Sequence, residues 1–179
     1  MKKICVFCGA SVPKDKRFIE DAQKLGDWIG KNNHRLIYGA GNTGLMGEVA
    51  QAVLKHHNNI IGITTHQIAS FEAPIDGLNT EYVDTIQTRK ERMIEKSDVF
   101  VALAGGIGTI DEVSDVMVQQ QIGLHSKPVI FTNTKNYYAP FDAWLKQLQN
   151  EGLISDRTKS RLNYTLAGDI EEVIQILEK

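Results

Sequence analysis

The segment from Val99 to Val113 constrains the fold of this chain more than any other stretch. Five apolar residues, Val99 to Leu103, stand in a row, which is typical of a strand buried on both faces. Gly105-Gly106-Ile107-Gly108-Thr109 follows at once and leads into an apolar pattern with helical spacing. A glycine turn at this place directs free backbone N–H groups at one point, where the helix dipole favours negative charge.

That turn predicts a phosphate site made by Gly105, Gly106, Gly108 and Thr109. Glycine suits the site because a Cβ would block a close approach and would disfavour positive φ. The alternative is a tight strand-to-helix turn that binds nothing.

Composition and charge narrow the class of protein. The chain has 179 residues, 42% of them apolar, which is enough for one sizeable core, and no linker, repeat or low-complexity run divides it. We therefore expect a single domain over residues 1–179. The net charge is −2 with Lys and Arg spread along the chain, which argues against nucleic acid as a partner. No apolar run suits a signal peptide or a membrane span, so we expect a cytoplasmic protein without a membrane partner.

The two cysteines form a C-x-x-C pair, Cys5 and Cys8, within an expected strand. Their odd separation places them on opposite faces of that strand, and no second cysteine pair exists to complete a zinc site. We interpret them as buried, inert thiols and expect no metal.

Strands and helices alternate along the chain. Expected strands cover 3–8, 35–38, 59–65, 99–103 and 128–132, with a short one at 81–85. Expected helices cover 15–31, 44–57, 88–96, 141–150 and 169–177, with another after the central strand that ends near Gly123 and a helical turn at 155–161. Residues 66–80 are expected to be irregular. This alternation predicts a doubly wound α/β fold, Rossmann-like, with a mainly parallel sheet and helices on both faces.

In such a fold the ligand binds outside the carboxyl ends of the strands, at a switch in strand order. The glycine turns at Gly9, Gly39–Gly44 and Gly105–Gly108 all follow strands and can converge there. Gly39–Gly44 also matches the G-x-G-x-x-G dinucleotide fingerprint. The fingerprint expects an acid about 20 residues later and follows the first strand. Here it follows the second strand and no acid ends the third, so a nicotinamide enzyme is disfavoured.

Two charged motifs admit more than one interpretation. Thr109-Ile110-Asp111-Glu112 matches a capping box, and the spacing alone favours a cap over a Glu112 that projects into the crevice. The run from Thr88 to Arg92 places cations at an expected helix start, where they are unfavourable for the dipole unless an anion or a carboxylate lies nearby.

The central motif resembles the hallmark of the LONELY GUY family of cytokinin riboside 5′-monophosphate phosphoribohydrolases, a family often mislabelled lysine decarboxylase. That hallmark is P-G-G-x-G-T-x-x-E, and the chain has Ala104-Gly105-Gly106-Ile107-Gly108-Thr109-Ile110-Asp111-Glu112. The resemblance covers nearly the whole chain. Further matches are Cys5 to Ser11, Tyr38 to Gly41, Gly44 to Gly47, Arg89-Lys90, Gln121 to Pro128 and Tyr137-Tyr138.

Three departures from the family pattern lie close to the expected pocket. Ala104 replaces the hallmark proline, Ile86-Gln87 replaces a Met-His pair, and Val118-Gln119 replaces a Thr-Trp pair. These departures bear on substrate identity more than on fold.

The resemblance implies hydrolysis of the N-glycosidic bond of a nucleoside 5′-monophosphate, such as AMP or a cytokinin precursor, without a cofactor. Arg89 and Glu112 become the expected catalytic residues, with Arg89 orienting Glu112 and keeping it ionised. Ser11 and Gly41 are expected at the nucleoside end, and Lys90 and Glu72 as weaker substrate contacts. A carrier of a phosphorylated ligand such as molybdenum cofactor is the alternative. A decarboxylase would need a pyridoxal-binding lysine that nothing in the sequence identifies.

The resemblance also implies a homodimer. Two helices carry more apolar residues than one sheet face needs, and exposed apolar helix faces commonly mark association surfaces. They are Ile110, Val113, Val116, Met117 and Ile122 after the hallmark, and Met93 and Ile94 in the helix before it.

Overall fold

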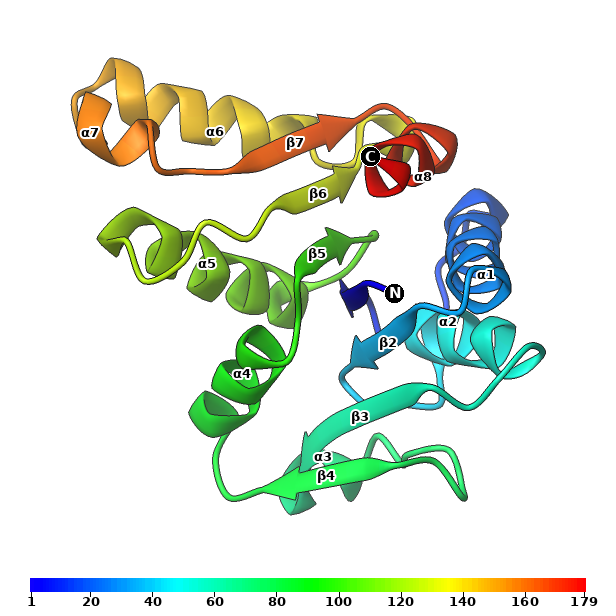
Figure 1. The fold of residues 1–179 in the computed structure, drawn as a ribbon. Helices are drawn as coiled ribbons and strands as arrows, with labels where there is room; N and C mark the ends of the chain where they lie inside the picture. The colour runs from blue at the N-terminus through cyan, green and yellow to red at the C-terminus, as the bar shows by residue number, and fades with distance from the viewer.

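The computed structural model describes all 179 residues and contains one seven-stranded sheet in the order β4-β3-β2-β1-β5-β6-β7 (Figure 1). Every neighbouring pair of strands is parallel. The strands are β1 (Lys3–Phe7), β2 (Arg35–Tyr38), β3 (Ile60–Thr65), β4 (Thr80–Val83), β5 (Val99–Ala102), β6 (Val129–Thr132) and β7 (Tyr164–Ala167).

Helices cover both faces of the sheet, as Figure 1 shows with α1, α2 and α8 on one side and α4 and α5 on the other. The helices are α1 (Lys16–Lys31), α2 (Gly44–Leu54), α3 (His66–Ala69), α4 (Ile86–Glu95), α5 (Ile107–Ile122), α6 (Ala139–Asn150), α7 (Asp156–Lys159) and α8 (Ile170–Glu178), with a short 3-10 turn, η1 (Thr134–Asn136). The predicted doubly wound α/β fold is confirmed. No helix is long and apolar enough to cross a membrane.

Two apolar clusters pack on opposite faces of the sheet. One joins α1, α2 and α8 to the strands, and the other joins α4, α5 and α6. Cys8 belongs to the first cluster and Cys5 to the second, and both are free, buried thiols as predicted. Burial raises the pKa of each thiol, which keeps it protonated and unreactive.

The second cluster also corrects an expectation about the helix surfaces. Most of the apolar residues that we assigned to an association surface pack inside the subunit instead. They are Ile110, Val113, Val116 and Met117 of α5 and Met93 and Ile94 of α4, whereas Ile122 is exposed.

The strand order reverses between β1 and β5. From β1 the chain proceeds through β2 and β3 to β4 at one edge, and from β5 through β6 to β7 at the other. Phe7 pairs with Ala102, and Val6 pairs with Tyr38, so the turns that follow β1, β2 and β5 leave the sheet at the same edge. This is the switch point at which such sheets bind ligands.

Several elements differ from the sequence-based expectation. The short helix α3 (His66–Ala69) lies in the stretch 66–80 that was expected to be irregular, and its N-cap Thr65 accepts from Ile68 N. The 3-10 turn η1 was not predicted either. The edge strand β7 was not predicted, because three of its four residues are partly or fully exposed and it carries no long apolar run. α4 begins at Ile86, two residues before the predicted start, because the Thr85 side chain caps it by accepting from Thr88 N. The cations Arg89 and Lys90 therefore lie beyond the first three helical residues, where the dipole penalty is smaller.

Candidate active site

A cavity of about 570 Å³ opens at the carboxyl edge of the sheet, above the β1–β5 switch. It is lined by 21 residues, most of which come from the three glycine turns, from α4 and α5, and from the segment after β3, with others from β1, α1, α2 and the segment before α6. The lining includes most of the predicted site residues, namely Ser11, Glu72, Arg89, Gly105, Gly106, Gly108, Thr109 and Glu112. The predicted convergence of the glycine turns is therefore observed.

The loop from Leu103 to Thr109, here called the glycine loop, exposes hydrogen-bond donors and few acceptors. None of the five backbone N–H groups from Gly105 to Thr109 has an acceptor within the chain. The carbonyls of residues 103–106, in contrast, all accept hydrogen bonds. Their donors are, in order, Tyr138 Oη at 2.7 Å, Gly9 N at 3.0 Å, Tyr137 Oη, and Ile110 N at 3.2 Å. Such a loop at the start of a 16-residue helix is suited to bind an anion.

The three glycines of this loop are needed for different reasons. A Cβ on Gly105 would lie 2.0 Å from Thr109 Oγ1, so the fold itself requires glycine there. A Cβ on Gly106 or on Gly108 would meet nothing within 4 Å. Both residues line the cavity, so a ligand that approaches the backbone explains their lack of a side chain. None of the three has a positive φ, and that part of our expectation was wrong.

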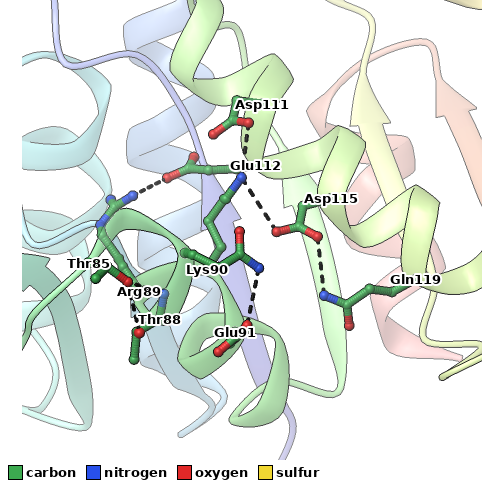
Figure 2. A network of polar contacts seen from close by, with 10 residues as sticks. Thr85, Thr88, Arg89, Lys90, Glu91, Asp111, Glu112, Asp115 and Gln119 are labelled. Carbon is green, nitrogen blue, oxygen red and sulfur yellow. Dashed lines mark hydrogen bonds and ion pairs between the residues drawn. The ribbon is translucent and has the colours of Figure 1, made fainter.

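Arg89 of α4 and Glu112 of α5 form an ion pair at the floor of the cavity (Figure 2). Arg89 Nη1 donates to Glu112 Oε1 at 2.6 Å, and the two side chains are only 8% and 12% exposed. Arg89 Nε also donates to the Ile63 carbonyl at 2.9 Å, which fixes the guanidinium against β3. The Glu112 carboxylate is thus held in one orientation while still facing the cavity.

The capping-box interpretation of Glu112 was wrong. The N-cap of α5 is Gly106, so Thr109 is already the third helical residue, and no side chain caps the helix. Glu112 lies on the next turn and pairs with Arg89 instead of with the helix terminus.

Burial also alters the acidity of Glu112. Desolvation raises the pKa of this carboxyl above its ordinary value, and the nearby Arg89 guanidinium opposes part of that rise. The charges of Asp111 and Glu72 add to the rise. We expected Arg89 to lower the pKa overall, but burial is the larger effect.

The sequence of this chain is similar to those of known proteins over most of its length. A family model described as "Possible lysine decarboxylase" matches residues 46–177. A cytokinin riboside 5′-monophosphate phosphoribohydrolase of Rhodococcoides fascians is 34% identical, over 97% of this chain and 87% of its own length. A relative named as a probable enzyme of this kind in Oryza sativa subsp. japonica is 35% identical, over 99% of this chain and 72% of its own length. The chain belongs to the LONELY GUY family.

Solved structures show that the fold extends beyond this family. The molybdenum cofactor carrier protein of Chlamydomonas reinhardtii superposes with a TM-score of 0.72 at 18% identity, covering 99% of this chain and 96% of that one. A molybdenum cofactor binding protein of Rippkaea orientalis gives 0.67 at 23%, with the same coverage. At these sequence identities, the similarity between this chain and the two molybdenum cofactor proteins shows a shared fold and nothing more.

Two residues predicted for the LONELY GUY site do not line the cavity. Lys90 points along α5, where its Nζ lies 3.0 Å from Asp111 Oδ1 and 3.5 Å from Asp115 Oδ2 (Figure 2). The sequence analysis expected an anion or a carboxylate beside the cations of residues 88–92, and for Lys90 the partners are these two carboxylates.

Gly41 is also absent from the cavity lining. It forms an isolated bridge with Pro74, and a Cβ there would lie 2.5 Å from Met46 Cε. A Cβ on Gly39 would lie 2.3 Å from Arg89 Nη2, so this glycine leaves room for the guanidinium. Within the Gly39–Gly44 motif, Gly39 therefore lines the cavity beside Arg89, whereas Gly41 packs against Met46 and Pro74.

The departures from the LONELY GUY pattern lie mostly outside the cavity. Only Ala104 is part of the lining. Gln87 is exposed and donates to Glu91, Val118 is exposed, and Gln119 donates to Asp115. Our expectation that all three departures lie near the pocket was therefore wrong for the two helical pairs.

Several cavity residues were not predicted from the sequence. They are apolar or aromatic and come from α1, α2, the segment after β3 and the start of α6: Phe18, Met46, Ile68, Phe71 and Tyr137. The apolar spacing of α1 predicts Phe18 on its core face, and Tyr137 was noted only as a family match. No group of three or more His, Cys, Asp or Glu side chains forms a metal-binding cluster.

Proposed function

We propose that this chain hydrolyses the N-glycosidic bond of a purine nucleoside 5′-monophosphate to give the free base and ribose 5-phosphate. One observation carries the proposal: a single cavity contains the unpaired N–H groups of the glycine loop and the oriented Glu112 carboxylate. The relatives named above, and a third from Arabidopsis thaliana at 33% identity, are named phosphoribohydrolases of cytokinin riboside 5′-monophosphates.

The glycine loop would hold the 5′-phosphate. Its donors, at Gly105, Gly106, Gly108 and Thr109, face a point at the positive end of the α5 dipole. Ser11, in the turn after β1, would contact the nucleoside.

The chemistry is assigned to Glu112. Breaking the bond between C1′ and the base nitrogen builds positive charge on the ribose, as in glycoside hydrolysis. Water adds to C1′, the electron pair of the broken bond leaves with the base nitrogen, and that nitrogen takes up a proton. A carboxylate beside C1′ stabilises the charge or accepts the proton of the water. Arg89 orients the carboxylate, and Glu72 is a second acidic candidate for substrate contact.

The base would occupy the apolar end of the cavity. Phe18 and Tyr137 pack edge to face at 5.5 Å on one wall, and Ile68 and Phe71 come from the segment after β3. A planar adenine, with or without an apolar substituent, suits such a wall. The substrates that we propose are therefore AMP and its cytokinin analogues.

The lysine decarboxylase activity in the family description finds no support in the cavity. Pyridoxal chemistry needs a lysine for its Schiff base, and no lysine is among the lining residues. Lys90, the lysine that follows Arg89 in the sequence, is not available for a Schiff base because it forms ion pairs with Asp111 and Asp115.

A product assay tests the proposal. Purified protein is incubated with AMP and, separately, with adenosine, and adenine and ribose 5-phosphate are quantified by chromatography. We expect equal amounts of both products from AMP and little release from adenosine, which lacks the anchoring phosphate. Binding of AMP without any adenine release would instead support a carrier of phosphorylated ligands.

We also propose that the protein is a homodimer. Large apolar side chains remain exposed on α4, on α5 and just after it, and such patches commonly mark interfaces. They are Ile86, Ile107, Val118, Ile122 and Leu124. Light scattering at micromolar concentration should give a mass of about twice the 20.0 kDa of one chain, and the mass of a single chain would contradict the dimer.

Residues 1–179 are proposed to act as one domain in the cytoplasm. The single continuous sheet supports the assignment to one domain.

A further inference from the structure

Two consecutive tyrosines connect the glycine loop to the segment between η1 and α6. Tyr138 Oη donates to the Leu103 carbonyl at 2.7 Å, and Tyr137 Oη donates to the Gly105 carbonyl. The two rings are perpendicular, with centroids 5.1 Å apart, so they approach the loop from different directions. Tyr138 is 1% exposed and belongs to the core, whereas Tyr137 is 42% exposed and lines the cavity.

The segment before Tyr137 is held in an unfavourable backbone conformation. Lys135 and Asn136 have φ values of 60° and 59°, in the left-handed region that non-glycine residues seldom occupy. Two contacts with α1 and its cap hold this segment: Lys135 Nζ lies 2.6 Å from Asp15 Oδ2, and Thr134 Oγ1 donates to Asp21 Oδ2 at 2.6 Å. Backbone strain that the surroundings enforce commonly marks a functional position. Here it delivers the Tyr137 hydroxyl to the loop.

The geometry of the peptide unit explains what this contact achieves. In a planar trans peptide the C=O of one residue and the N–H of the next point in opposite directions. Fixing the Gly105 carbonyl toward Tyr137 therefore turns the Gly106 N–H away from Tyr137. Without this contact the peptide could rotate and present a carbonyl oxygen to the bound anion, which would repel it.

We propose that Tyr137 is a positioning residue for phosphate binding, which acts by fixing the orientation of the Gly105–Gly106 peptide. This inference rests on the proposed function and adds to it a residue that the glycine motif does not contain. The Tyr137 hydroxyl acts through the loop, and its ring remains part of the cavity wall.

Tyr137→Phe tests the inference, because it removes the hydroxyl and keeps the ring. Tyr82→Phe is the matched control, since Tyr82 is also partly exposed and its hydroxyl makes no hydrogen bond within the chain. Dissociation constants for AMP and for adenosine are measured by calorimetry for the parent and both variants. Amide NMR signals of residues 105–109 are compared in the ligand-free proteins, and melting temperatures verify folding.

We expect Tyr137→Phe to weaken AMP binding by about tenfold, the order expected when the charge-assisted contact from the Gly106 N–H to the phosphate is weakened, and to leave adenosine binding unchanged. The Gly106 amide signal should shift in the ligand-free Tyr137→Phe protein and stay in place in Tyr82→Phe. If the parent prefers AMP and Tyr137→Phe keeps that whole preference, the positioning role is wrong while the proposed function stands. If the parent binds AMP no better than adenosine, the phosphate site itself is wrong, and the positioning role falls with it.

Discussion

The pKa of the Glu112 carboxyl is raised by some neighbours and lowered by another, and the balance sets the pH range in which this group is ionised. It is nearly buried, and desolvation raises its pKa most strongly, with further upward contributions from Asp111 and Glu72. Arg89 opposes this rise without cancelling it. A carboxyl group with a raised pKa exchanges protons closer to neutral pH, which suits acid–base catalysis.

This balance predicts the acid limb of the pH profile. The proposed mechanism needs ionised Glu112, so kcat/KM is full above the raised pKa and falls as the pH drops through it. Glu72→Gln removes a negative neighbour that raises this pKa, so the limb should move to lower pH, whatever happens to the maximal rate. The substrate phosphate also titrates, at about pH 6, but its contribution is the same for parent and variant. If the acid limb of kcat/KM does not move in Glu72→Gln, this limb reports the ionisation of a group other than Glu112.

At the scale of the element, the glycine loop combines two kinds of glycine. Gly105 is required by the packing of Thr109, whereas Gly106 and Gly108 face open space in the cavity. Gly105 is needed for folding, whereas we expect Gly106 and Gly108 to be needed for ligand binding. Substitutions at the two kinds of position therefore separate an effect on stability from an effect on binding.

Gly106→Ala should therefore fold normally and lose phosphate affinity. Its Cβ has no steric conflict in the free chain but occupies the surface that the phosphate approaches. We expect AMP binding to weaken by about tenfold or more, equivalent to about 1.4 kcal/mol, with adenosine binding and the melting temperature unchanged. Gly168→Ala, outside the cavity and with its nearest neighbour at 3.4 Å, is the control. Equal losses for AMP and adenosine would mean that the phosphate lies elsewhere.

At the scale of the whole molecule, the sheet order brings distant segments to one cavity. β5, the glycine loop and the alternation of strands and helices were predictable because their signals are local and strong. The edge strand β7 was not, because a short, half-exposed strand carries little apolar signal. The contact between Tyr137 and Gly105 joins residues 32 positions apart, and no local pattern encodes it. The cap of α5 was misjudged because a shift of three residues in the helix start turns Thr109 from a cap into an interior residue.

The most direct test of this account is the kcat for adenine release from AMP by Glu112→Gln, measured beside Asp111→Asn. Asp111 is the adjacent acid on α5, but it pairs with Lys90 and does not line the cavity, so its variant controls for the loss of a charge. If Glu112 performs the chemistry, Glu112→Gln loses about a hundredfold or more in kcat while it still folds and binds AMP, and Asp111→Asn keeps the parental rate. If Glu112→Gln melts earlier but releases adenine at the parental rate, Glu112 is only a structural partner of Arg89, and the catalytic assignment is contradicted.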